Sequence, residues 1–364
     1  MIYLDNGATT LHKPPAVAAA MTEAMRRCAN PGRGGHAAAM AAAETVYRCR
    51  ETAADLFSCQ PEQVAFTSNC THGLNIAIHS LVQPGDKVVI SGFEHNAVLR
   101  PLHAHNARLT VAGRRLFDWD DTLAEFEKAI KNGAKIGVFT HVSNVFGYIL
   151  PVEQMAKLCR ENGVRFIVDA AQSAGSLPIS LTDWGADFIA MPGHKGLLGP
   201  QGTGILLCGA QPKPLLYGGT GSASRDRDMP DFLPDRVEAG TLNVPGIAGL
   251  NVGLNYLRRV GIEHILAREQ RQVSACARGL QSLGCRVFTG AHQAGTLSFL
   301  PPMDCEEAAE KLAGQGIALR SGLHCAPLAH ESAGTLETGT VRISFGHDAT
   351  DAQTQMLLKA AAQL

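Results

Sequence analysis

Two side chains stand where buried strands are predicted to end, and both are of types that can do chemistry. Lys195 follows the apolar run 186–191 and lies in a glycine-rich turn, while Asp169 closes a second apolar run, 164–168. Lysine is ordinarily a solvated surface residue, so its place at the exit of a core strand indicates an amine held in a pocket. There its pKa can be lowered, which suits imine formation.

The pair formed by Asp169 and Lys195 meets the requirements of pyridoxal phosphate. A carboxylate at the carboxyl end of a parallel strand faces the crevice where α/β proteins bind ligands. Asp169 would keep the pyridine nitrogen protonated, so that the ring acts as an electron sink, and Lys195 would hold the aldehyde as a Schiff base. Two plainer interpretations remain open. Lys195 could be an exposed loop residue, and Asp169 could be the N-cap of a helix.

Three further polar residues, Thr71, His95 and Asn144, each follow a predicted strand. Thr71 lies at the start of a helix, where free N–H groups and a hydroxyl can seat a phosphate, although a plain helix cap is an equal alternative. His95 could stack on a flat cofactor, although a buried histidine is more often a satisfied core group. Because the carboxyl ends of parallel strands share one edge of a sheet, we expect these residues to converge with Asp169 and Lys195.

The alternation of apolar runs with helical patterns predicts an α/β fold with a mainly parallel, doubly wound sheet. The segment 222–238 is polar, charged and proline-containing, which indicates a surface excursion. A change to long helices after residue 243 indicates a smaller α+β domain. We expect an N-terminal segment (1–15), a large domain (16–243) and a small C-terminal domain (244–364). The predicted strands are 63–67, 87–91, 134–140, 164–169, 186–191, 317–320 and 340–345, and the predicted helices are 16–27, 36–58, 96–106, 152–162, 244–260 and 261–283.

The predicted small domain carries a cysteine and an arginine with chemical potential. Cys325 follows His324 in a loop between a glycine and a proline, an exposed and partly electropositive setting that favours a thiolate; a buried cysteine is the alternative. Arg342 stands among apolar β-forming residues, where a charge is costly to bury unless it binds an anion. A bidentate grip on a substrate carboxylate and a structural ion pair both account for it.

Composition narrows the classes of function. The 364 residues include 45% hydrophobic and 18% charged residues, as in a globular enzyme large enough for two domains. A net charge of −1 gives no electrostatic footprint for nucleic acid. No run approaches the roughly 20 apolar residues of a membrane span, and the sequence opens without a basic and apolar leader, so we expect a cytoplasmic protein. Ten cysteines without a Cys-x-x-Cys pair predict neither a metal site nor a disulfide framework.

Taken together, these motifs resemble the class V aminotransferase family of pyridoxal-phosphate enzymes, and within it the short-loop type of the cysteine desulfurase and selenocysteine lyase branch. The runs 169–172, 193–195 and 320–325 carry the resemblance, which extends over essentially the whole chain. It implies the type I fold of pyridoxal-phosphate-dependent transferases. It also implies conversion of L-cysteine to L-alanine, with the sulfur transferred to Cys325 as a persulfide.

The resemblance further implies roles for individual residues and a homodimer. Lys195, Cys325 and His95 are the implied catalytic residues. The implied cofactor contacts are Lys195 at the aldehyde, Asp169 at the pyridine nitrogen, Gln172 and Asn144 near the ring hydroxyl, His95 on the ring face, Thr71 and His194 at the phosphate, Cys70 beside it where a threonine is common, and Thr241 from a second subunit. The implied substrate contacts are Arg342 at the carboxylate, with Asn30 and Arg33 at the same entrance.

Arg342 lies only 17 positions after Cys325, which leaves a short loop. Such a confined cysteine predicts slow turnover unless an acceptor protein collects the sulfur. A selenocysteine lyase, or another amino-acid lyase or epimerase on the same scaffold, is the alternative that keeps the cofactor. An oxidoreductase that uses 199–204 as a dinucleotide loop is disfavoured, because this run precedes a strand instead of opening a helix. A non-catalytic protein is disfavoured because the lysine, aspartate, cysteine and arginine are all retained.

Overall fold

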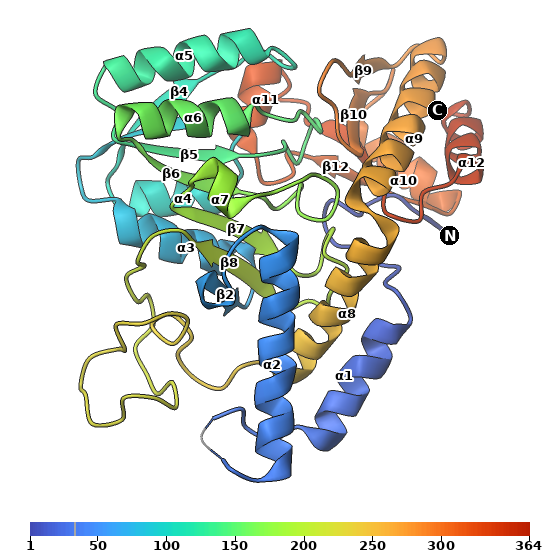
Figure 1. The fold of residues 1–364 in the computed structure, drawn as a ribbon. Helices are drawn as coiled ribbons and strands as arrows, with labels where there is room; N and C mark the ends of the chain where they lie inside the picture. The colour runs from blue at the N-terminus through green and yellow to red at the C-terminus, as the bar shows by residue number, and fades with distance from the viewer. Residues whose placement is uncertain (33) are drawn as a thin grey trace.

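The protein is described here by a computed structural model that covers residues 1–32 and 34–364. Figure 1 shows a large sheet with helices on both faces and, beside it, a smaller unit that contains the C-terminus. The irregular segment that follows the large sheet extends away from it, as the polar composition of 222–238 predicts. None of the helices in the described ranges has the length and hydropathy needed to cross a membrane.

The large sheet is mainly parallel, as predicted. In spatial order its strands are β2 (Val64–Thr67), β8 (Gly204–Cys208), β7 (Phe188–Pro192), β6 (Arg165–Asp169), β5 (Ile136–Thr140), β3 (Lys87–Ser91) and β4 (Arg108–Ala112). Neighbours run parallel except at β8, which is antiparallel to β2 and β7. The accompanying helices are α1 (Ala16–Arg27), α2 (Ala37–Leu56), the 3-10 helix η1 (Pro61–Gln63), α3 (Cys70–Leu81), α4 (Asn96–Ala104), α5 (Trp119–Lys131), α6 (Val152–Asn162) and α7 (Leu181–Trp184).

Both faces of the large sheet are buried. Successive residues of a strand point to opposite faces, so Val88 and Ile167 belong to one buried cluster, while Val89 and Val168 belong to another. This explains why β5, β6 and β7 are continuous apolar runs without alternation. Because helices cover the faces, polar side chains for a site must come from the ends of the strands.

The C-terminal unit combines a small antiparallel sheet with helices. Its sheet has the order β12 (Arg320–Gly322), β13 (Thr340–Ser344), β10 (Thr296–Leu300) and β9 (Arg286–Phe288). Its helices are α9 (Ile262–Ser282), α10 (Cys305–Gly314), α11 (Pro327–Ala333) and α12 (Asp351–Ala361), and α8 (Val244–Val260) leads into it. Helix α8 lies beside α1 and α2, so it joins the two parts of the chain (Figure 1).

The N-terminal segment ties the two parts together. Strand β1 (Ile2–Tyr3) pairs in parallel with β11 (Ile317–Ala318) of the C-terminal unit. A few residues later, the Thr10 hydroxyl donates to the main-chain carbonyl of Lys195 over 3.0 Å. The first residues of the chain therefore connect the small unit to the turn that holds the lysine.

One predicted strand is divided in the structure. The run 317–320 was expected to form a single strand, but its two ends belong to different sheets, β11 with β1 and β12 with β13. The division follows from the N-terminal strand, whose two residues are too few to show a period in the sequence.

A buried ion pair anchors the irregular segment that precedes α8. The Arg50 guanidinium donates to Glu238 and to the Val64 carbonyl, and Glu238 also accepts from the Phe66 N–H over 2.6 Å. The guanidinium lies 4.6 Å from the centroid of the Phe66 ring. Both charged side chains are buried, so each depends on the other for compensation.

Replacing Arg50 with methionine is therefore expected to lower the free energy of unfolding by about 3 kcal/mol, because it leaves the Glu238 carboxylate buried and unpaired. Urea denaturation measures the change. The double variant Arg50→Met/Glu238→Gln, which removes both charges, is expected to recover a large part of the loss. An equal loss in both variants would show that the arginine contributes through packing and not through charge.

Candidate active site

The ends of several strands place polar side chains around one cavity, as the strand-end argument predicts. Asp169 is the last residue of β6, and Lys195 lies in the turn after β7. His95 precedes α4 as its N-cap, after β3, and Asn144 follows β5. The cavity has a volume of about 500 Å³ and opens to solvent. The predicted residues that line it are Cys70, Thr71, His95, Asn144, Asp169, Gln172, His194 and Lys195.

Close main-chain contact fixes the turn that carries Lys195. Gly175, with φ +99°, packs against Gly196 so closely that a Cβ on Gly175 would lie 2.2 Å from the Gly196 carbonyl oxygen. Only glycine suits this position. Burial lowers the pKa of the Lys195 ammonium, and the negative charge of Asp169 partly opposes this effect. The lysine is thus an amine that gives up its proton more readily than a surface lysine.

The Asp169 carboxylate is 2% exposed and presents its two oxygens differently. Its Oδ1 accepts from the Ala171 N–H over 2.9 Å and lies 3.4 Å from the Cys70 sulfur. No donor among residues 1–32 and 34–364 reaches Oδ2. A buried carboxylate with one free oxygen, in a cavity beside a buried amine, fits the protonated ring nitrogen of pyridoxal phosphate.

The N-terminus of α3, which also lines the cavity, suits an anion. Helix α3 begins at Cys70, and the Asn69 side chain caps it by accepting from the His72 N–H over 2.9 Å. The first N–H groups of a helix have no partner within it, and the helix dipole adds positive potential there. Thr71 contributes a hydroxyl at this end. Together with the carboxylate and the lysine, this helix end completes a set of residues that fits the cofactor.

The two histidines of the cavity are neutral. His95 Nδ1 accepts from the Ala97 N–H over 3.0 Å, so Nε2 carries the ring proton. Burial lowers the pKa of His95, although Asp169 opposes this. His194 Nδ1 lies 3.0 Å from the Thr9 hydroxyl oxygen, and burial lowers its pKa to about 4.

Arg342 lies beside the site and forms an ion pair, one of the two alternatives that the sequence left open. It is 2% exposed and forms an ion pair in which its Nη2 lies 2.6 Å from Asp5 Oδ1. Its Nη1 donates to the Asn144 carbonyl over 3.1 Å. Its Nε is buried without a partner in the described residues, so the hydrogen-bonding capacity of the guanidinium is not fully used, although Arg342 does not itself line the cofactor cavity. Burial lowers the pKa of the guanidinium and Asp5 opposes the change.

Two amide side chains hold neighbouring loops in place. Asn144 Nδ2 donates to the His324 carbonyl over 2.8 Å, and Gln172 Nε2 donates to the Gly7 carbonyl over 2.9 Å. Both residues line the cavity, and neither amide oxygen has a hydrogen-bond partner within the described residues.

Cys325 is exposed and stands on a constrained main chain. It lines an open groove with Thr71, His95 and Arg100, and the first two of these also line the cofactor cavity. Both His324 and Cys325 adopt left-handed conformations, with φ of +49° and +59°. The Cys325 carbonyl accepts from the Asn96 N–H over 2.8 Å.

The expectation that His324 makes the cysteine loop electropositive is wrong. Its ring is buried, with Nε2 3.1 Å from the Thr340 carbonyl oxygen, and burial lowers its pKa to about 2. The ring is therefore neutral and points into the protein. Arg100, which lines the same groove as Cys325, is the residue that brings a positive charge to this groove.

Not all predicted residues meet at this cavity. Asn30 and Thr241 line a separate, open cavity beside α2, which shares no lining residue with the cofactor cavity among the described residues. Arg33, predicted at the substrate entrance, lies outside the described residues. Within one chain, then, these contacts are not assembled around Lys195.

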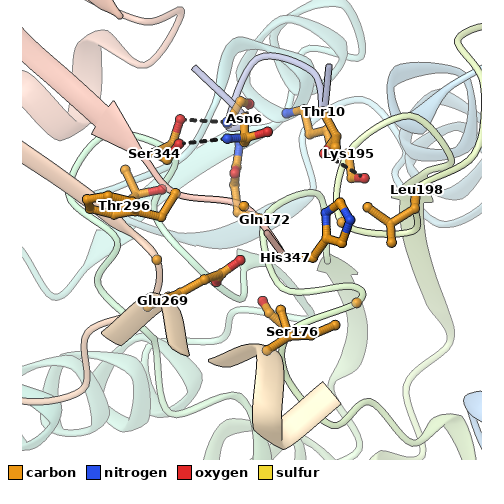
Figure 2. A pocket seen from close by; sticks show the side chains of 18 of the residues that line it. Asn6, Thr10, Gln172, Ser176, Lys195, Leu198, Glu269, Thr296, Ser344 and His347 are labelled. Carbon is orange, nitrogen blue, oxygen red and sulfur yellow. Dashed lines mark hydrogen bonds between the residues drawn. The ribbon is translucent and has the colours of Figure 1, made fainter. Parts of the chain in front are cut away.

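A second cavity, of about 530 Å³, adjoins the first and shares Gln172 and Lys195 with it. Figure 2 shows Glu269 pointing into it, with Ser176 and His347 nearby. Burial raises the pKa of Glu269 to about 8. Glu269 is not recognisable as a site residue from the sequence, because an acidic residue on the amphipathic helix α9 is expected to be exposed. The role of Asp5 as the partner of Arg342 is also not recognisable from the sequence, because its surroundings show only a turn-rich composition.

Comparisons with known proteins agree with this geometry. The family model described as "Aminotransferase class-V" matches residues 2–357. A probable cysteine desulfurase of Pyrococcus abyssi is 34% identical over 95% of this chain and 89% of its own length. One of Methanothermobacter thermautotrophicus is 32% identical over 98% of this chain and 92% of its own.

Solved structures confirm the predicted fold type. The apo cysteine desulfurase of Thermococcus onnurineus superimposes with a TM-score of 0.91 at 32% identity, covering 100% of this chain and 94% of that one. The cysteine desulfurase CsdA of Escherichia coli gives a TM-score of 0.86 at 26% identity, with coverage of 100% and 94%. The chain belongs to the class V aminotransferase family, and the prediction of pyridoxal phosphate as its cofactor is confirmed with it.

Proposed function

We propose that this protein is a pyridoxal-phosphate-dependent cysteine desulfurase that converts L-cysteine to L-alanine and receives the sulfur on Cys325 as a persulfide. The observation that carries the proposal is the placement of Cys325. It lies exposed in a groove that shares Thr71 and His95 with the cavity around Lys195 and Asp169. Relatives that match nearly the whole chain carry the name probable cysteine desulfurase.

When bound, pyridoxal phosphate supplies an electron sink that stabilises negative charge on the α-carbon of an amino acid. Residues at two points of the cavity would hold it. Asp169 would offer Oδ2 to the ring nitrogen, and the N-terminus of α3 with Thr71 would receive the phosphate. His95 would cover the ring as a neutral imidazole with its proton on Nε2.

The substrate would be oriented by Arg342, beside the cavity, and deprotonated by Lys195 within it. Arg342 would bind the substrate carboxylate with the hydrogen-bonding capacity left on its guanidinium, which Asp5 and the Asn144 carbonyl hold in place. Lys195 has a lowered pKa, so its amine can take the α-proton of the substrate and return a proton later.

Sulfur transfer is a displacement at the substrate sulfur. The sulfur of Cys325 attacks it, a sulfur–sulfur bond forms and the carbon–sulfur bond of the substrate breaks. The remaining three-carbon amino acid takes up a proton and leaves as alanine. The net reaction moves one sulfur atom from L-cysteine to the thiol of Cys325, and no external oxidant or reductant is needed.

The active unit in this proposal is a homodimer. Asn30 and Thr241 line a cavity of their own in each chain. Thr241 of the partner subunit would complete the phosphate site. Main-chain hydrogen bonds hold the Cys325 loop in place. The proposal therefore includes an acceptor protein that approaches the cysteine to collect the sulfur. A cytoplasmic location is part of the proposal, because all ten cysteines are free thiols, as in a reducing compartment.

Replacing Cys325 with alanine is expected to reduce alanine release from L-cysteine by more than about 100-fold, because the displacement loses its nucleophile. Cleavage of L-selenocysteine is expected to survive, because selenium can leave without this attack. The measurement is alanine release from each amino acid by the purified, cofactor-loaded protein. Cys28→Ala, which removes a thiol outside the site, is the control.

Full cysteine turnover by Cys325→Ala would rule out Cys325 as the sulfur carrier. A wild-type protein that cleaves only selenocysteine would instead be a selenocysteine lyase on the same scaffold.

A further inference from the structure

The thiol of Cys70 lies in the cofactor cavity and contacts the key carboxylate. Cys70 is the first residue of α3 and is 8% exposed. Its Sγ lies 3.4 Å from Asp169 Oδ1, a hydrogen-bond distance for sulfur, and the thiol is the donor. Lys195 lines the same cavity. The mechanism described above makes no use of this thiol.

Asp169 Oδ1 therefore has two donors from two different elements. The Ala171 N–H comes from the turn that follows β6 and lies 2.9 Å away. The Cys70 S–H comes from the start of α3. Two donors on one oxygen restrict rotation of the carboxyl group and draw part of its negative charge toward Oδ1. Oδ2, which has no donor in the described part of the chain, is left facing the cavity.

The chemistry of Cys70 differs from that of Cys325. Burial raises the pKa of the Cys70 thiol well above its ordinary value, the charge of Asp169 adds to this, and Lys195 opposes it. The thiol therefore stays protonated at neutral pH and can donate. Cys325 is exposed and can be reached by a sulfur-bearing substrate or an acceptor.

We propose that Cys70 is a positioning residue: its S–H fixes the Asp169 carboxylate so that Oδ2 meets the ring nitrogen of the cofactor, and it lowers the negative charge that this oxygen presents. The inference rests on the cofactor-binding part of the proposed function and not on the identity of the substrate. It assigns Cys70 no share in carrying sulfur.

The test compares Cys70→Ser, which keeps a donor, with Cys70→Ala, which has none. The readout is the pH midpoint of the absorbance change of the bound cofactor. Removing the donor concentrates charge on the Asp169 carboxylate, which favours the positively charged form of the cofactor. The midpoint is therefore expected to rise by about 0.5 pH unit in Cys70→Ala, the equivalent of one weak hydrogen bond. In Cys70→Ser it is expected to stay near or below the wild-type midpoint.

Equal midpoints in the wild type and both variants would overturn the proposal, since Cys70 would then only fill space. Alkylation by iodoacetamide, mapped by mass spectrometry, gives a second readout. Cys325 is expected to be labelled at least 10-fold faster than Cys70. Rapid labelling of Cys70 in the folded protein would also overturn the proposal. Turnover is not measured in either assay, so a failed desulfurase assay and a failed Cys70 test remain distinguishable.

Discussion

Lys195→Ala is expected to reduce alanine release from L-cysteine by at least about 10³-fold, because one amine both attaches the cofactor and moves the α-proton. The amine is buried and its pKa is lowered, so no other side chain of the cavity can take over both tasks. The absorbance of lysine-bound cofactor is expected to vanish together with turnover. Both are measured on the purified, cofactor-loaded protein.

The fold should survive this change, since the contact that Lys195 makes with Thr10 uses the main-chain carbonyl and not the amine. Lys195→Arg, which keeps a charge but cannot attach the cofactor, is expected to be as inactive as alanine. Lys213→Ala, at an exposed position, is the matched control and should retain full activity. Substantial turnover by Lys195→Ala would refute the assignment of this lysine.

Arg342→Lys is expected to raise KM for L-cysteine by about 10- to 100-fold with a much smaller effect on kcat. Loss of a hydrogen bond to a charged group costs about 1.5–3 kcal/mol, and lysine cannot grip a carboxylate in the bidentate manner of arginine. An interaction made equally in the ground state and the transition state affects KM more than kcat. Steady-state kinetics with L-cysteine measure both constants.

The ion pair with Asp5 provides the means to separate binding from structure. If Arg342 served only to pair with Asp5, its replacement would lower the thermal midpoint and leave KM unchanged, and the double variant Asp5→Asn/Arg342→Met would recover stability. A rise in KM that persists in the double variant would instead identify the arginine as the carboxylate site. Asp5→Asn alone keeps a hydrogen-bond partner for the guanidinium but removes the negative charge. The change in its thermal midpoint therefore measures how much the charge of Asp5 contributes to stability.

The convergence of His95, Asn144, Asp169 and Lys195 could be predicted from the sequence because it depends on one regular property. Apolar runs mark the strands of a parallel sheet, and whatever follows them lies at one edge. Once the position of each residue was predicted, its chemical role followed from its residue type. Prediction succeeded here since no contact between distant segments had to be guessed.

Contacts between distant segments were not predictable in the same way. Asp5 and Arg342 are separated by 337 positions and meet because a strand of two residues pairs with β11. A strand that short carries no period. The direction of the His324 ring was likewise undetermined, because its partner, the Thr340 carbonyl, is a main-chain group that no sequence pattern marks.

The hydrogen bonds on the cysteine loop have a consequence for how this region can change during evolution. The Cys325 loop is held through the carbonyls of His324 and Cys325, which the Asn144 side chain and the Asn96 main chain bind. Every amino acid has such a carbonyl, so the exposed side chains around the loop can change without moving the sulfur, whereas the Asn144 amide and the buried His324 ring must be kept. What selection must avoid are residues that resist a left-handed conformation, above all proline and the β-branched types. The position of the thiol thus depends mainly on the main chain, while the side chains of the groove around it can change to suit a different acceptor.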